Sequence, residues 1–62
     1  MQVLSDYMDR KGLTQIDMAQ MLGISQGQLN NWLTGKRKPS VPSLKRISER
    51  TGLSLKRLAK DL

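Results

Sequence analysis

The sequence contains no cysteine and no histidine. Without cysteine the chain forms neither disulfides nor thiolate metal sites, and without histidine it lacks the commonest general base and the commonest metal ligand. The acidic residues are spread singly along the chain rather than paired for acid–base chemistry; they are Asp6, Asp9, Asp17, Glu49 and Asp61. We therefore expect a protein that is not an enzyme, with no catalytic residues, no metal site and no cofactor.

Long apolar segments are also absent. No run approaches the roughly 18 apolar residues that a membrane span requires. The first residues do not combine a basic segment with a long apolar one, as a signal peptide does. We therefore expect a cytoplasmic protein without a membrane as partner. Because the chain also has no linker, repeat or low-complexity tract, we expect residues 1–62 to form a single domain.

What the chain does contain is mainly basic and helix-forming residues. Eleven basic residues against five acidic ones give a net charge of +6, which favours a polyanionic partner, either nucleic acid or an anionic membrane surface. Phenylalanine is absent, whereas Leu, Met, Gln, Lys and Arg are plentiful, and these residues lose little side-chain freedom in a helix. The composition therefore predicts an all-α fold.

Apolar spacing and capping residues predict a compact bundle of about five short helices. The first covers about residues 2–11 and ends at Gly12, and the others begin after caps at Thr14, Ser25, Ser40 and Ser54. The expected buried residues are Val3, Leu4, Tyr7, Met8, Ile16, Ala19, Leu22, Leu29, Trp32, Leu33, Val41, Leu44, Ile47, Leu55, Leu58 and Leu62. A peptide on a membrane surface would instead need one long amphipathic helix, which the glycines and prolines interrupt.

The segment Thr14–Thr34, TQIDMAQMLGISQGQLNNWLT, has the pattern of a helix-turn-helix. Two short helices flank a turn of about three residues that contains Gly23. Ala19 is small enough for the two helices to cross closely, and Leu29 and Trp32 are spaced to pack the second helix on the core. An alternative interpretation is that Trp32 stacks on a base, as aromatic residues do in proteins that bind single strands. Its spacing from Leu29 favours a position in the core instead.

The outer face of the second of these helices, over about residues 26–33, carries side-chain amides. Its residues are Gln26, Gly27, Gln28, Asn30 and Asn31. Such a run is unusual because Asn is a modest helix former and Gly a poor one. Gln and Asn, however, pair bidentately with adenine N6 and N7 in the major groove. The face therefore indicates a recognition helix whose residues contact the bases of double-stranded DNA.

A basic loop follows the recognition helix. Lys36, Arg37 and Lys38 lie where the chain leaves the major groove, which favours contact with phosphates over a merely solvated loop. We also predict phosphate contacts for the residues at the two ends of the recognition helix, Ser25 and Thr34. The remaining basic residues of the second half of the chain are expected mainly on a solvated face.

Nearly the whole chain resembles the Cro/CI-type (Xre-family) helix-turn-helix repressors of temperate phages and their bacterial relatives, and most of all the Cro-type proteins. The resemblance lies in the LT-Q after the first helix, the GISQ turn, the WLxGKRKPS stretch and the closing TGLSL. It implies a lambda-repressor-like fold and a transcriptional repressor that acts on operator DNA at the nucleoid of a bacterial host.

The resemblance also implies roles for single residues. It implies that Gln15, which begins the second helix, contacts a phosphate and braces Gln26. It further implies that bases are read from Gln26, from the next position, Gly27, and from Asn31 one turn further on. Gly27 departs from the frequent family pattern because it has no side chain.

A second function is compatible with the same fold. Proteins of this fold also serve as the DNA-binding antitoxin of a toxin pair, or as protein-interaction modules. The chain has no spare tail that would wrap around a toxin, which favours the repressor over this alternative.

The small size of the chain predicts dimerisation on DNA. One recognition helix reads only a few base pairs, and comparable proteins place two copies on a palindrome with half-sites about 34–36 Å apart. We therefore expect a homodimer on a palindromic operator. We expect a monomer when the protein is free, because few apolar residues remain for a second interface. The candidate subunit contacts are Pro39–Pro42 and Leu53–Leu62.

Overall fold

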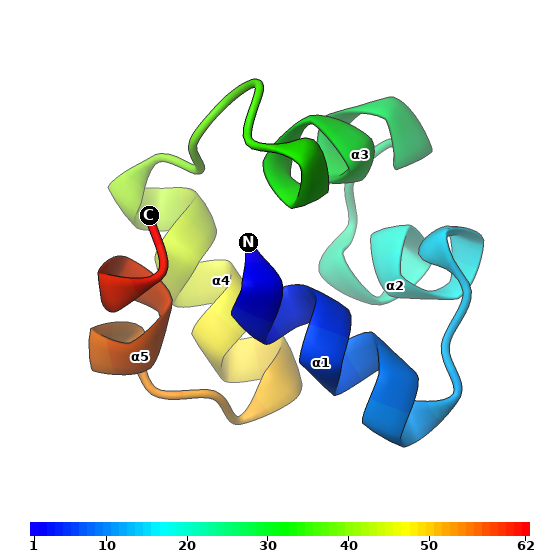
Figure 1. Cartoon of the computed structure of the whole chain (residues 1–62), viewed down its shortest axis with the longest axis horizontal. Helices are drawn as coiled ribbons and strands as arrows, with labels where there is room; N and C mark the ends of the chain where they lie inside the picture. Colours follow the sequence, from blue (N-terminus) through cyan, green and yellow to red (C-terminus); the bar gives the residue numbers. More distant parts are fainter.

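Five α-helices and no strand make up the computed structural model, which describes residues 1–62. The helices are α1 (Gln2–Lys11), α2 (Gln15–Leu22), α3 (Gln26–Thr34), α4 (Val41–Thr51) and α5 (Leu55–Lys60). Figure 1 shows how the five helices are arranged. They surround one hydrophobic core, and the Cα radius of gyration is 10.2 Å. This confirms the predicted all-α bundle of short helices, in which α2 and α3 form the helix-turn-helix.

Each helix from α2 to α5 begins with a hydroxyl side chain that accepts a backbone N–H. At α2 the bonds are reciprocal: Thr14 Oγ1 accepts the Asp17 N–H at 3.1 Å, and Asp17 Oδ2 accepts the Thr14 N–H at 3.1 Å. The bond from the Thr14 backbone, followed by that from its hydroxyl, lowers the pKa of Asp17 below its ordinary value of 3.8, because both favour the carboxylate. The predicted caps Ser25, Ser40 and Ser54 are likewise confirmed.

The turn between α2 and α3 depends on Gly23. Its φ of 70° lies in the left-handed region, which a residue with a Cβ adopts only with strain. The Gly23 N–H donates to Gln20 O at 3.1 Å, and the Ile24 N–H donates to Ala19 O at 3.0 Å. These bonds satisfy carbonyls at the end of α2, and the chain turns so tightly that α3 begins directly after Ser25.

The core contains buried apolar residues from all five helices and from the segment before α5. They are Leu4, Tyr7, Met8, Met18, Ala19, Leu22, Leu29, Trp32, Leu44, Ile47, Leu53 and Leu58. Val3 and Leu33 pack against this core while half-buried. Most of the predicted core is therefore confirmed.

Four residues that we expected in the core are exposed. Their exposed fractions are 55% for Ile16, 65% for Val41, 41% for Leu55 and 42% for Leu62. The first three lie in the first turn of a helix and the fourth is the last residue of the chain. Apolar spacing identifies a stripe along a helix, but only the part that another element covers is buried. These positions lie beyond that covered part.

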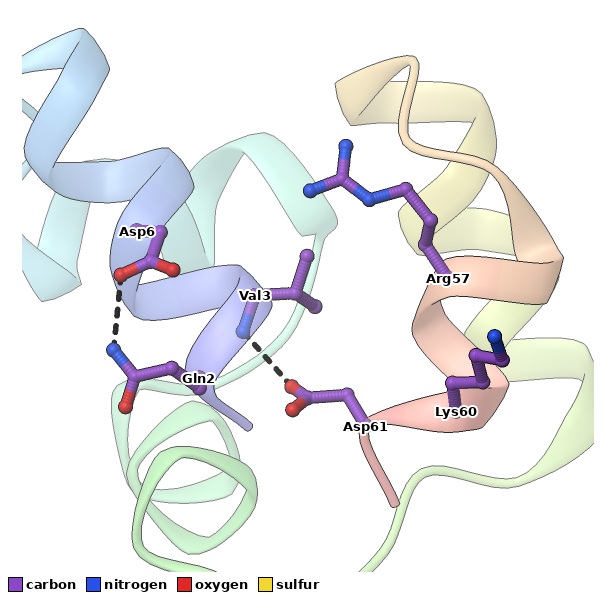
Figure 2. A pocket seen from close by; sticks show the side chains of 6 residues that line it. All are labelled: Gln2, Val3, Asp6, Arg57, Lys60 and Asp61. Carbon is purple, nitrogen blue, oxygen red and sulfur yellow. Dashed lines mark hydrogen bonds between the residues drawn. The ribbon is translucent and has the colours of Figure 1, made fainter.

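Hydrogen bonds link the two ends of the chain. The Val3 N–H donates to Asp61 Oδ2 at 2.8 Å, so a carboxylate beyond α5 caps the first turn of α1 (Figure 2). Met1 supplies no side-chain cap of its own. Its amino group donates to Trp32 O at 3.0 Å and to Leu33 O at 3.3 Å, in the last turn of α3. The first residues of the chain therefore connect α1 to both α5 and α3.

None of the five helices has the length and apolar character needed to cross a bilayer. The acidic side chains do not gather into a group that could hold a metal ion.

Candidate nucleic-acid interface

Helices α2 and α3 pack through small and fully covered side chains. Leu22 and Leu29 are 0% exposed, and Ala19 is 4% exposed. Ala19 has only a methyl group and is covered where α2 packs against α3. Trp32 is also buried, so its indole belongs to the core and is not available to stack on a base. This packing buries one side of α3 in the core and leaves its opposite face exposed or half-buried.

The opposite face of α3 carries the predicted base-contacting residues. Gln26, Gly27 and Gln28 are exposed, and Asn30 and Asn31 are half-buried. The hydrogen bonds of these residues within the chain use backbone groups. The Gln28 N–H donates to Ser25 Oγ at 3.1 Å, and Asn30 O accepts the Thr34 hydroxyl at 2.9 Å. The side-chain amides of this face are therefore left to pair with an external partner.

Gly27 is the one position of this face without a side chain. It lies within α3, and it is the only glycine of the chain whose φ is not positive. A Cβ built on Gly27 would have no heavy atom within 4 Å. A glycine inside a helix costs about 0.5–1 kcal/mol relative to alanine. No contact within the chain explains this cost.

The basic loop after α3 is held by backbone bonds while its side chains are exposed. Gly35 ends α3 with a φ of 81°, and the Arg37 N–H donates to Asn31 O at 3.2 Å. Pro39 is buried at the other end of the loop. Lys36, Arg37 and Lys38 are all exposed, so the loop presents three cations beside α3.

A cleft of about 530 Å³ lies between α3, the basic loop and the start of α4. It is lined by Ser25, Gly27, Gln28, Asn31, Trp32, Arg37, Lys38, Ser40 and Ser43. The lining therefore combines predicted base contacts with predicted phosphate contacts. Amides, hydroxyls and two cations suit the polar and negatively charged surface of DNA.

The structure places the other predicted site residues outside this cleft. Gln26 and Asn30 lie on α3, and Gln15 is half-buried at the first position of α2. Thr34 is exposed in the last turn of α3, and its hydroxyl donates back to the helix. Lys36 is exposed in the loop. These residues extend the candidate interface to both ends of α3 and to the start of α2.

Two hydroxyl residues of the cleft lie outside the set of site residues predicted from the sequence. They are Ser40, which the sequence predicts only as a helix cap, and Ser43. Their side chains are hydrogen-bonded to each other at 3.0 Å. The PSVPS spacing of the two serines was the available signal, but only the fold brings them opposite α3.

The family comparison agrees with this geometry. A helix-turn-helix family model matches residues 4–60 of the chain. The match covers well over half of the sequence, and the chain belongs to this helix-turn-helix family, which is a family of DNA-binding domains and not of enzymes. No curated protein and no solved structure matches the chain. The predictions of an Xre-like helix-turn-helix and of DNA binding are confirmed at the level of the family.

Proposed function

We propose that the chain is a Cro-like transcriptional repressor that reads a palindromic operator with α3 in the major groove. The observation that carries the proposal is the outer face of α3, which presents unpaired side-chain amides on a helix that the core holds in place. Amides of this kind pair bidentately with adenine. A repressor with this function acts where the operator lies, at the nucleoid of a bacterial or phage-infected cell.

In the proposed complex the site residues divide into two groups. The base-contacting group is Gln26, Gly27, Gln28, Asn30 and Asn31. The phosphate-contacting group is Gln15, Ser25, Thr34, Lys36, Arg37 and Lys38. The first group lies on one face of α3, and the second lies around it, on α2, at the ends of α3 and in the basic loop. This arrangement allows phosphate contacts to orient the duplex while the amides read its bases.

The proposal is tested in two steps. Bound sequences are first selected from a random pool of duplexes, and the affinity of a Gln26 variant for the selected operator is then measured. Gln26→Ala is expected to weaken binding to the selected operator by about 1–3 kcal/mol and to leave binding to random DNA unchanged. The matched control is Gln20→Ala, because Gln20 is an exposed amide on α2 outside the proposed face. Equal losses on operator and random DNA would remove Gln26 from the reading role.

We propose further that two copies bind the palindrome as a homodimer and separate when free. The free chain exposes only three large apolar side chains in the two candidate contact segments, Val41 in the first and Leu55 and Leu62 in the second. These are too few for a stable apolar interface without DNA. An insertion of about five base pairs between the half-sites turns them by about half a helical turn, and we expect it to abolish cooperative binding. Equal affinity for one half-site and for the whole palindrome would exclude the dimer.

A further inference from the structure

We infer that Gly27 determines specificity: it forms a gap in the reading face of α3 that receives the C5-methyl group of a thymine. The inference rests on the proposed function, because it requires that α3 lies against base pairs. Gly27 has no side chain with which to form a hydrogen bond, and the inference gives it an apolar partner, the thymine methyl group.

The reason for glycine at this position lies outside the chain. Gly12, Gly23, Gly35 and Gly52 end helices with positive φ, which explains their identity, but Gly27 does not. Packing does not explain it either, since an added Cβ would meet nothing within 4 Å. Alanine would form the helix better. Glycine at this position therefore reduces folding stability without a benefit in the free protein.

Gly27 lies at the centre of the exposed face of α3. The residue is exposed between Gln26 and Gln28, and Asn31 follows one turn later on the same side of α3. It also lines the cleft between α3 and the basic loop. The row of amides is thus interrupted at its centre by a site at which the helix backbone itself is the surface.

The chemistry of the neighbouring amides points to thymine as the occupant. Gln and Asn favour adenine, and every adenine in the duplex is paired with a thymine whose C5-methyl projects into the same groove. A methyl group gains from an apolar contact and needs room for one carbon. The Cα of Gly27 supplies the contact, and the missing Cβ supplies the room. A side chain at this position would hold α3 away from the methyl and weaken the amide contacts beside it.

The test removes one carbon from the DNA and adds one to the protein. The operator is the duplex selected by the wild-type protein, and each thymine is replaced in turn by uracil, which lacks only the methyl group. Gly27→Ala is expected to bind the thymine operator about 5- to 100-fold more weakly than wild type. At one thymine position, replacement by uracil should restore most of this loss in the variant but should not improve binding by the wild-type protein.

Two controls separate this effect from other causes. Thermal unfolding of Gly27→Ala should show a melting temperature about 2–8 °C above wild type, so weaker binding is not a folding defect. Binding to random DNA should be unchanged. A loss that is equal on random DNA would mean that the sugar–phosphate backbone fills the gap, and that result overturns the inference.

The inference is also overturned if Gly27→Ala binds the operator as tightly as wild type, or if no uracil position relieves its loss. A failure of the proposed function is recognised separately and earlier, because the wild-type protein would then select no duplex from the random pool.

Discussion

The carboxylate of Asp61 allows a quantitative test of the hydrogen bond that joins the two ends of the chain. Asp61 Oδ2 accepts the Val3 N–H at 2.8 Å in a partly buried setting, and it is the side-chain cap of α1 (Figure 2). Replacement of a capping side chain by alanine costs about 0.5–2 kcal/mol. Since the first-turn N–H of α1 would lose its partner, we expect Asp61→Ala to cost about 1 kcal/mol. In a domain of this size that lowers the melting temperature by about 4–8 °C.

Two further variants separate the cap from a general effect of charge. Asp61→Asn keeps an oxygen acceptor, and asparagine caps helices about as well as aspartate. It should lose only the interaction of the charge with the helix dipole, about 0.3–1 kcal/mol. Asp6→Ala is the matched control, because Asp6 accepts from Gln2 Nε2 at 2.9 Å on the exposed side of α1. Such pairs contribute about 0.2–0.5 kcal/mol.

The assay is thermal unfolding followed by far-ultraviolet circular dichroism and by the fluorescence of Trp32, which is buried in the core. Coincident transitions justify a two-state comparison of the variants. The expected order of stability is wild type, then Asp61→Asn, then Asp61→Ala. An Asp61→Ala protein no less stable than Asp6→Ala would show that the bond from Val3 to the end of the chain does not hold α1 in solution.

Three other predictions follow from charge, pH and burial. Replacing the basic residues 36–38 by glutamine should weaken binding to all DNA sequences and flatten the plot of log affinity against log salt by about 0.9 per lost phosphate contact; replacing the three basic residues of α5 should change this slope less. Because the pKa of Asp17 is lowered from 3.8, its capping bonds stabilise the fold above that pH and are lost as the pH falls through the lowered value. Asp17→Asn should therefore reduce the loss of stability measured below about pH 4 in acid titrations. Leu22→Ala should cost about 2–5 kcal/mol in thermal unfolding, whereas Ile16→Ala should cost no more than about 0.5 kcal/mol, and similar losses in the two would contradict their assigned burial.

Local signals in the sequence determined the helices and their ends. Thr14 caps α2 through bonds to a residue only three positions away, and Gly23 ends it because its own backbone adopts a positive φ. Such interactions are complete within one turn, so residue type and spacing predict them. The side of α3 on which the amides lie was predictable for the same reason. Once Leu29 and Trp32 face the core, helical geometry puts the amides of α3 on the other side.

Only the tertiary structure decided which apolar side chains are covered and which distant residues meet. Ile16 and Ala19 belong to the same predicted stripe, but the exposed fraction is 55% for the first and 4% for the second, because a neighbouring helix covers only the second. The bond between Val3 and Asp61 joins residues 58 positions apart, a separation at which spacing carries no information. The cleft that places Arg37 opposite Gly27 likewise arises from the path of the loop between α3 and α4. Contacts of this kind depend on how whole helices are placed relative to one another, which packing of the complete core determines.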